Sequence, residues 1–254
     1  MPLSIVGLGI CLDLTENALE EIKNADEVWI EAYTTRYSER ILNNVKNKIK
    51  SIAKKEAKIV DRELMESNMP LSIAKTKNLV ICCFGDPLFA TTHISLIAEA
   101  EKQRIKWKVI QNAGILNAVL KIGLSPYKFG QVLTISKWYE NYKPLSWAEK
   151  LVVNLNNGMH TICLIDPEIK SANELYEIIK HADSRYGFSK VIKIIFYIKN
   201  AGCENESIGT ISMHDIKNFD MIDNLTLIIP SKMNENEIYF TSILAKGGNK
   251  KLEK

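Results

Sequence analysis

The chain of 254 residues contains no apolar run long enough to cross a bilayer. Its first residues lack the basic stretch of a secretion signal and reach Gly7 almost at once, so we expect neither export nor a membrane partner. Cysteines number only five, and no two have Cys-x-x-Cys spacing. An odd count without such a pair indicates reduced thiols, and we expect a cytoplasmic protein.

Histidine is scarce as well: the four residues are His93, His160, His181 and His214. They stand at no metal-ligand spacing, so we predict no metal site. The chain also lacks a Gly-x4-Gly-Lys-Ser/Thr phosphate loop and a Gly-x-Ser-x-Gly elbow, which leaves little support for a nucleoside triphosphatase or a serine hydrolase. The net charge of +3 is too small to argue for nucleic acid, and we expect no DNA partner.

Apolar runs and amphipathic segments alternate through the first half of the chain. We predict helices after most of the strands, including residues 71–77 and 93–103, and residues 38–58 are predicted to form a helix and its exit. The predicted strands are residues 3–9, 26–33, 59–60, 78–84 and 107–110. Alternation of this kind is typical of an α/β domain with a largely parallel sheet.

The second half has a different character, because its strands follow one another with fewer helices between them. The predicted strands are residues 131–136, 160–166, 191–198 and 225–229, and the helices are residues 145–155, 172–181 and 234–244. We therefore expect two α/β domains, residues 1–115 and residues 116–244 with a mixed sheet. Residues 245–254, which hold Gly247, Gly248 and four lysines, are expected to form a flexible tail.

A Gly85-Asp86-Pro87 turn stops the strand at residues 78–84. Glycine allows positive φ, aspartate can accept a hydrogen bond from the chain two residues on, and proline fixes the next φ. Other predicted strands also end in small or turn-forming residues, at Gly9, residues 112–115 and residues 165–166. In an α/β sheet such ends converge on one crevice, which is where ligands bind. Main-chain groups and a single carboxylate suit an adenosine-containing cofactor better than a polyphosphate.

One alternative comes from Gly7 and Gly9, which follow the first strand as in a dinucleotide-binding fingerprint. Glu31 ends the second strand, where an acid that binds ribose is expected. Position 12 is leucine, however, and not the third glycine of that motif. A nicotinamide-dependent enzyme therefore stays open as an alternative, as does a turn without a ligand.

Several longer blocks identify a resemblance. They are Ile5-Val6-Gly7-Leu8-Gly9, Glu31-Ala32-Tyr33-Thr34, Gly85-Asp86-Pro87 with Ala90-Thr91-Thr92-His93, Asn112-Ala113 with Asn117-Ala118-Val119, and Gly158-Met159-His160-Thr161. In these blocks the chain resembles the diphthine synthases, methyltransferases of the tetrapyrrole methylase superfamily. The resemblance extends from about residue 5 to residue 166 and more weakly to residue 230.

This resemblance implies a two-domain tetrapyrrole-methylase-like fold, with S-adenosyl-L-methionine bound in a cleft between the domains. It also implies a homodimer. The implied substrate is the amino-carboxypropyl histidine of translation elongation factor 2, which is methylated during diphthamide biosynthesis. Alternatives within the superfamily are a methylase of a tetrapyrrole or of ribosomal RNA, and a third possibility is a binding module without catalytic activity.

Carried over by motif, the implied cofactor contacts are Ile10, Asp86, Phe89, Gly114, Ile115, Ile165, Asn200 and Leu225. Two of these depart from the family pattern, since Phe89 replaces a small residue and Leu225 replaces a histidine. The loop after Asp166 is also shorter than in eukaryotic relatives.

No acid–base dyad is evident, and in-line methyl transfer does not strictly require one. The catalytic residues are therefore unknown, with His93, Tyr33 and Glu31 as candidates. For His93 we favour a structural role at a helix start, for Thr91 and Thr92 helix capping, and for His160 the start of a strand. The lysines of residues 46–55 are interpreted as the solvated face of a helix, with contact to ribosomal RNA as the alternative.

Overall fold

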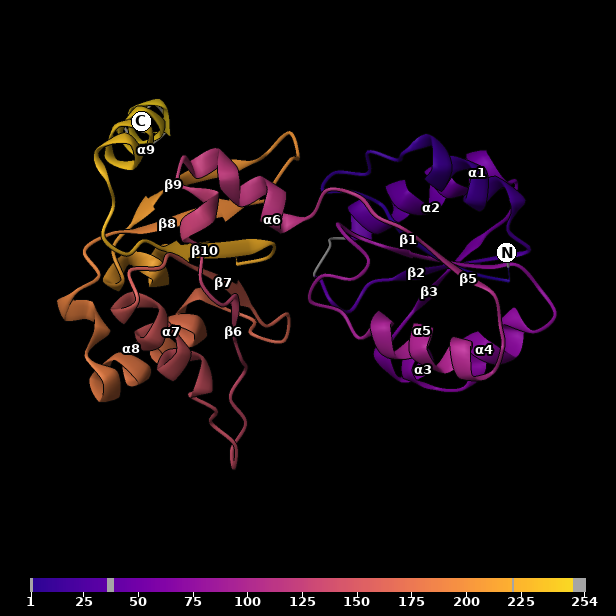
Figure 1. Ribbon diagram of the computed structural model, residues 1–254, viewed down its shortest axis with the longest axis horizontal. Coiled ribbons are helices and arrows are strands. Elements are labelled where there is room, and N and C mark those ends of the chain that lie inside the picture. Colours follow the sequence, from indigo (N-terminus) through magenta and orange to yellow (C-terminus); the bar gives the residue numbers. More distant parts are fainter. Residues whose placement is uncertain (1, 36–38, 221, 249–254) are drawn as a thin grey trace. The chain divides into compact units, whose positions relative to one another are not determined.

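The computed structural model describes residues 2–35, 39–220 and 222–248. The chain divides into two compact units, Met1–Ala118 and Val119–Lys254. Figure 1 shows that each unit is a sheet with helices packed against it. Among the helices of the described part, none is both long enough and apolar enough to cross a membrane.

The first unit holds a sheet of five parallel strands in the order β3-β2-β4-β1-β5. The strands are β1 (Leu3–Gly7), β2 (Glu27–Glu31), β3 (Ala57–Val60), β4 (Leu79–Cys83) and β5 (Trp107–Ile110). All residues of β1 and β4 are buried, which explains why both strands read as continuous apolar runs. The predicted parallel sheet is confirmed.

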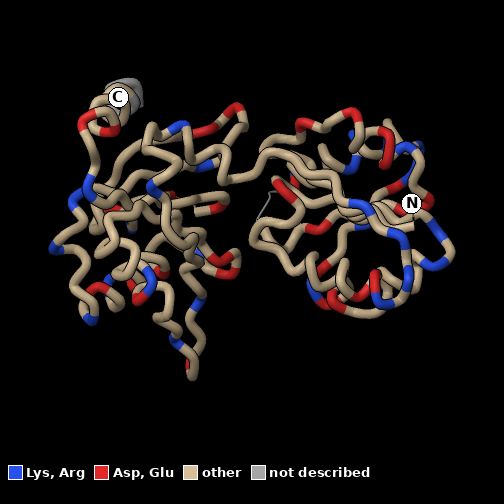
Figure 2. Tube along the Cα trace, viewed as in Figure 1, with Lys and Arg blue, Asp and Glu red and all other residues tan. Residues whose placement is uncertain are grey.

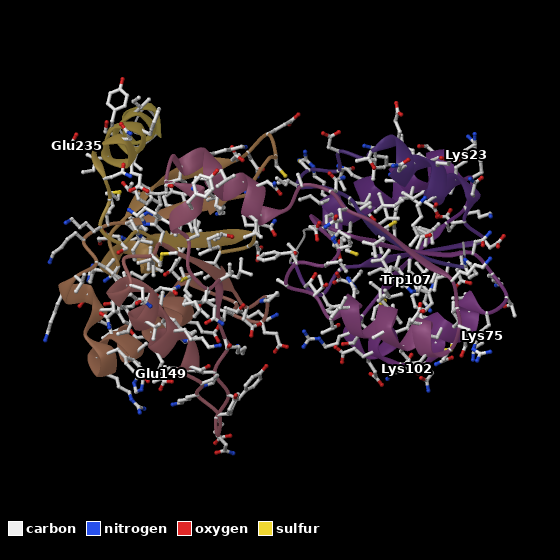
Figure 3. All side chains as sticks on the ribbon, in the orientation of Figure 1. Lys23, Lys75, Lys102, Trp107, Glu149 and Glu235 are labelled. Carbon is white, nitrogen blue, oxygen red and sulfur yellow. The ribbon has the colours of Figure 1, made fainter. Side chains whose placement is uncertain are left out.

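Helices cover both faces of this sheet. Figure 1 shows α1 and α2 on one face and α3, α4 and α5 on the other. Their bounds are α1 (Glu16–Asn24), α2 (Glu39–Ala53), α3 (Arg62–Glu66), α4 (Met69–Ala74) and α5 (His93–Lys102). The short helix α6 (Ile115–Ala118) follows β5. Side chains alternate along a strand, so Val80 packs in one apolar cluster and Ile81 in the other. Figure 3 labels Trp107, the first residue of the edge strand β5.

The second unit holds a mixed sheet in the order β6-β7-β10-β8-β9. The strands are β6 (Leu133–Ile135), β7 (Thr161–Ile165), β8 (Ile195–Lys199), β9 (Ser207–Ile211) and β10 (Leu225–Ile229). Only β6 and β7 pair in parallel, and the other pairs are antiparallel. The predicted mixed sheet is therefore also confirmed.

The α-helices in the described part of this unit are α7 (Ser146–Asn156), α8 (Ala172–Tyr186) and α9 (Glu235–Gly248). Short 3-10 turns are η1 (Val119–Ile122), η2 (Pro126–Lys128), η3 (Phe188–Lys190) and η4 (His214–Asn218). The helices α7 and α8 pack on the sheet through one large apolar cluster that includes Leu151 and Leu175. They are also joined at the surface, where Tyr186 Oη donates to Glu149, labelled in Figure 3, at 2.7 Å.

Two predictions about this unit need correction. The helix α9 begins at Glu235 (Figure 3) and extends to Gly248, so residues 245–248 are helical where a flexible tail was expected. Residues 249–254 of that predicted tail lie outside the described residues. The strand predicted at residues 191–198 begins only at Ile195, because the left-handed Gly187 ends α8 and η3 follows it.

The basic stretch at residues 46–55 lies on and just after α2. Lys48 and Lys50 are exposed, while Val45 and Ile49 of the same helix are buried. Lys50 pairs with Glu56 and Lys48 Nζ donates to Leu12 O, so these charges form the solvated face that we predicted. Figure 2 shows basic and acidic segments mixed within each unit.

Candidate functional site

The carboxyl ends of β1 and β4 are joined by hydrogen bonds beyond the strands themselves. Gly9 N donates to Gly85 O at 3.3 Å, and Gly85 N donates to Gly9 O at 2.9 Å. Both glycines have positive φ, +75° for Gly9 and +68° for Gly85, which side chains rarely permit. The two turns therefore hold each other in place. Together with Asp86, Asn112 and Gly114, we call these two glycines the rim.

Close packing explains the glycines around the rim. A Cβ atom on Gly7 would lie 2.7 Å from Gly85 O and 3.0 Å from Pro87 Cδ. A Cβ atom on Gly114 would lie 3.1 Å from Asp86 N. The segment after β5 thus packs directly on the Gly-Asp-Pro turn. The predicted convergence of strand ends is confirmed for the ends of β1, β4 and β5.

Asn112 links the rim to the loop after β1. Its Nδ2 donates to Gly7 O at 3.1 Å and to Asp13 O at 2.7 Å, and its Oδ1 accepts from Ala113 N at 2.8 Å. Sequence reasoning placed Asn112 in a motif without giving it a role. The available signal was a side-chain amide directly after a strand, where its donors can reach a neighbouring strand end.

Asp86 is the carboxylate of the rim, and it is only partly buried. Its Oδ1 accepts from Leu88 N at 2.9 Å, as predicted for a turn-forming aspartate. Its Oδ2 accepts from Gln111 Nε2 at 3.5 Å, at the long limit of a hydrogen bond. The carboxylate therefore keeps acceptor capacity for a ligand hydroxyl or ammonium group.

The other contacts implied for this unit lie next to the rim in the chain. Ile10 follows Gly9, Phe89 lies in the turn after Pro87, and Ile115 begins α6. All three are half-buried, whereas Gly114 is buried. Their role in binding a cofactor stays a prediction.

Glu31 is buried at the carboxyl end of β2, with 1% of its surface exposed. Its Oε1 accepts from Tyr33 N and from Thr34 N, each at 2.8 Å, and its Oε2 accepts from Thr34 Oγ1 at 2.8 Å. The carboxylate thus fixes the turn that follows its own strand. This use favours a structural role over the ribose-binding role considered for position 31.

Tyr33 follows in the same turn and is half-buried. Burial raises the pKa of its phenol; the nearby Thr92 hydroxyl opposes this shift, and the charge of Glu31 reinforces it. The Tyr33 hydroxyl is therefore protonated at neutral pH and can donate a hydrogen bond. It is not suited to remove a proton from a substrate amine.

His93 is buried at the start of α5, and one of its ring nitrogens has the main-chain partner that we predicted. Its Nδ1 lies 2.7 Å from Pro87 O, and Thr91 Oγ1 donates to the same carbonyl at 2.8 Å. The predicted capping by threonine is wrong in its detail. Thr92 occupies the N-cap position of α5 but makes no capping bond, because its ψ of 5° is not extended.

In the second unit, the three implied contacts gather at one end of the sheet. Ile165 ends β7, Asn200 follows β8, and Leu225 begins β10. Thr226 pairs with Leu164 in antiparallel register, so Leu225 lies opposite Ile165. Their contact with a cofactor stays a prediction.

Asn224 was missed at this end of the sheet. Asn200 and Asn224 both have positive φ, 51° and 53°, and Asn200 N donates to Asn224 O at 3.2 Å. Asparagine tolerates this backbone conformation, which was the signal available in the sequence.

His160 does more than open a strand. Ser231 N donates to its Nδ1 at 3.0 Å, so the ring hydrogen lies on Nε2 and is donated to Glu237 Oε1 at 3.0 Å. Both side chains are buried. Burial lowers the pKa of His160, against the opposing effect of Glu237. His160 therefore anchors α9 as a neutral imidazole. The apolar residues that follow it in the sequence indicated only the start of a strand, and not this role.

Comparison with known proteins places this geometry in a family. The family model of the tetrapyrrole (corrin/porphyrin) methylases matches residues 2–216. The human diphthine methyl ester synthase is 36% identical over 177 residues, which are 69% of this chain and 60% of that protein. The Dictyostelium discoideum diphthine methyl ester synthase is also 36% identical over 177 residues, covering 67% of this chain and 63% of the relative. The chain thus spans less than two thirds of the length of these curated relatives.

A solved structure agrees with the sequence comparison. A crystal structure of diphthine synthase superposes with a TM-score of 0.80 at 26% identity, and the match covers 96% of each chain. The α/β fold with a parallel and a mixed sheet is therefore that of a diphthine synthase. Because the family model matches most of its length, the chain belongs to the tetrapyrrole (corrin/porphyrin) methylases.

Proposed function

We propose that this chain is a diphthine synthase that uses S-adenosyl-L-methionine to methylate the modified histidine of translation elongation factor 2. The family and the names of its curated relatives support this proposal. The family also disfavours a nicotinamide-dependent enzyme, and Glu31, which that alternative needed, is occupied by its own turn.

The rim is the structural observation that supports this proposal. Gly9, Gly85 and Gly114 bring main-chain atoms from three strand ends together without side chains between them. Asp86 adds one partly exposed carboxylate with unused acceptor capacity. These groups fit an adenosyl sulfonium, because its hydroxyl and ammonium groups are donors and its positive charge is attracted by a carboxylate. We propose that Ile10, Phe89 and Ile115 contact the same cofactor.

Methyl transfer needs little acid–base catalysis from side chains. When bound, the cofactor supplies an electrophilic methyl group, and transfer breaks its S–C bond while a new N–C bond forms on the substrate. The substrate nitrogen must first lose a proton, which desolvation favours. Tyr33 stays protonated and its hydroxyl is buried, and the Glu31 carboxylate accepts hydrogen bonds from its own turn. We therefore assign no general base among the three candidates.

Cofactor binding is tested with two substitutions at one position. Asp86→Asn keeps the hydrogen bond from Leu88 N but removes the charge, and Asp86→Ala removes both. We expect calorimetry to show affinity for S-adenosyl-L-methionine reduced about tenfold or more in both variants, since a charged hydrogen bond contributes about 1.5–3 kcal/mol. Wild-type affinity in Asp86→Asn would contradict a direct role for the carboxylate. Absence of binding by the wild type would contradict the cofactor itself.

The substrate is tested by mass spectrometry. Elongation factor 2 that carries the unmethylated amino-carboxypropyl histidine is incubated with the protein and S-adenosyl-L-methionine. We expect mass increments of one methyl group or more on that histidine, and slower methylation by Asp86→Ala at a cofactor concentration near the wild-type Kd. Ribosomal RNA and a tetrapyrrole serve as competing substrates in parallel reactions. Labelling of either one in place of the protein would identify a different branch of the family.

We also propose that the protein is a cytoplasmic homodimer. The helix α9 supports self-association, because several of its exposed side chains in the described part are large and apolar or aromatic. Ile238 is 53% exposed, Tyr239 63% and Ile243 49%. A patch of this kind on a helix is typical of a surface that another protein covers. Sedimentation of the wild type and of an Ile238→Asp, Ile243→Asp double variant would show a dimer and a monomer, respectively.

A further inference from the structure

A buried cluster of three metal-ligating side chains lies beneath the turns at the carboxyl edge of the first sheet. Glu31 ends β2, Cys83 ends β4, and His93 begins α5. A carboxylate oxygen, the thiol sulfur and an imidazole nitrogen all lie within 4.8 Å of one another. The exposed fractions of the three residues are 1%, 0% and 1%. Spacing of histidines along the chain predicted no metal site, but the parallel fold brings residues from three separate segments together.

His93 has the arrangement typical of a metal-bound histidine. Its Nδ1 faces Pro87 O at 2.7 Å and therefore carries the ring hydrogen. The lone pair is left on Nε2, which is buried and has no hydrogen-bond partner among the described residues. A carbonyl that fixes one ring nitrogen while the other stays available is the usual outer contact of a histidine ligand.

One carboxylate oxygen of Glu31 keeps an unused lone pair. Its Oε1 accepts from two main-chain amides, whereas Oε2 accepts at 2.8 Å only from the Thr34 hydroxyl among the described donors. A carboxylate oxygen has two lone pairs, so Oε2 can bind a cation without losing that hydrogen bond. The turn that holds Glu31 also keeps the oxygen oriented, as outer contacts do in metal sites.

Cys83 is the third group, and its Sγ lies 3.7 Å from His93 Nδ1. Burial raises the pKa of this thiol well above its usual value, with smaller contributions from Glu31, Cys82 and Asp86. The thiol is therefore protonated when no cation is bound. Binding of a dication would replace that proton by an S–metal bond and release the proton to solvent.

We propose that Glu31, Cys83 and His93 form a site for a thiophilic divalent cation of the zinc type. Sulfur, imidazole and carboxylate are the ligand types that zinc prefers, and they lie about 3–4 Å apart in a tetrahedral site. Because Cys83 Sγ contacts Nδ1, which Pro87 O already holds, binding through Nε2 needs the thiol and the His93 ring to shift relative to each other. The thiolate and the carboxylate would balance the two positive charges, which a buried site requires. This inference does not depend on the proposed methyl transfer.

Cobalt(II) is the probe, because its spectrum reports the ligands. Metal-free full-length protein is titrated with Co²⁺ and followed by absorbance. We expect a near-ultraviolet sulfur-to-cobalt band, visible bands of a tetrahedral ion, one equivalent bound and one proton released. Addition of Zn²⁺ should abolish the spectrum.

Neighbouring cysteines provide a matched control. Cys82 and Cys83 are both fully buried in β4 but belong to different apolar clusters, on opposite faces of the sheet. Cys83→Ser should eliminate the sulfur-to-cobalt band, whereas Cys82→Ser should leave it intact. His93→Asn, which keeps a donor for Pro87 O, and Glu31→Gln, which keeps an acceptor for the turn, should each weaken Co²⁺ binding tenfold or more.

The opposite results would overturn the site. A wild-type protein without a sulfur-to-cobalt band at millimolar Co²⁺ would show that the cluster does not bind a divalent cation through Cys83. A band that disappears with Cys82→Ser and persists with Cys83→Ser would assign the sulfur elsewhere. Circular dichroism checks the fold of each variant, and if Cys83→Ser does not fold, the affinities of His93→Asn and Glu31→Gln decide.

Discussion

At Gly7 the space available for a side chain is smaller than a methyl group. The nearest atoms to an added Cβ are the main-chain oxygen of Gly85, the Cβ of Asn112 and the ring of Pro87, and none of them is the free end of a flexible side chain. Gly158 provides a contrast within the same chain, since it has φ of +69° but no atom within 4 Å of an added Cβ. Both positions favour glycine, but for different physical reasons.

Replacement of these two glycines by alanine separates the two reasons. Gly158→Ala should cost about 1–2 kcal/mol, the penalty for left-handed backbone with a side chain. Gly7→Ala should cost about 1–3 kcal/mol from overpacking and should also displace the Gly-Asp-Pro turn. Urea unfolding measures the two losses, and calorimetry measures cofactor affinity. We expect reduced affinity in Gly7→Ala alone; equal affinities would show that the rim is not part of the binding site.

Part of this site could be predicted from the residue types in the sequence. The positive φ of Gly85, the turn bond to Asp86 and the main-chain partner of His93 follow from local chemistry, and all are present. The cluster of Glu31, Cys83 and His93 depends instead on the pairing of β2 with β4, which no local pattern specifies. Sequence alone therefore predicted that the strand ends of the rim converge, but not that Glu31, Cys83 and His93 meet.

At the scale of elements, α9 is held by a single buried carboxylate. Burial alone would raise the pKa of Glu237, but hydrogen bonds from Asn234 N, Lys128 Nζ, His160 and Ser125 N outweigh it and lower the pKa to about 2. Lys128 Nζ lies 2.9 Å from Oε2, and Ser125 N lies 3.0 Å from Oε1. One side chain thus joins α9 to η2 and to the start of β7.

This arrangement predicts a loss of stability in acid. A carboxylate whose pKa is lowered on folding stabilises the protein above its unfolded pKa, and that contribution disappears as pH falls through the folded value. We expect Glu237 to contribute about 3 kcal/mol at pH 7, a contribution lost between about pH 4.5 and about pH 2. The lowered pKa of His160 acts in the same direction, since unfolding lets the imidazole take up a proton below about pH 6.5.

Glu237→Gln tests the carboxylate directly. Its free energy of unfolding at pH 7 should be lower than that of the wild type, because Lys128 loses its partner. The difference between the two proteins should shrink as pH falls below about 4.5, where the wild-type carboxylate begins to be protonated in the unfolded state. A constant difference from pH 7 to pH 3 would show that the charge of Glu237 is unimportant.

Most elements were predictable from apolar periodicity, and the exceptions have physical causes. The strand β9 was missed because Gly209 interrupts its alternation, yet Tyr197 packs over that glycine, where a Cβ would lie 2.8 Å from the phenol oxygen. The short helix α3 was also missed. It depends on capping by Asp61, whose carboxylate accepts from Leu64 N, and not on a repeated apolar face.

At the scale of the whole molecule, each unit has its own apolar core. The large cluster around Leu151 lies entirely in the second unit, and the clusters that contain Val80 and Ile81 lie entirely in the first. Because the two cores share no residues, we predict that the two units unfold separately.

Two core substitutions test this separation. Leu151→Ala should cost about 2–5 kcal/mol and increase hydrogen exchange in β6, β7 and β10 while leaving β1 and β4 unchanged. Ile81→Ala should have the reverse effect, because both residues are fully buried in their own units. If either variant accelerates exchange in both sheets, the chain unfolds as one cooperative body.

The position of β1 in its sheet has a consequence for synthesis on the ribosome. It is made before both of its partners, β4 on one side and β5 on the other, and the last residue of β5 is Ile110. The nascent chain therefore carries an apolar strand without either partner until much of the first unit has emerged. Such a segment is exposed to aggregation during translation, and its protection falls to chaperones that bind extended apolar peptides.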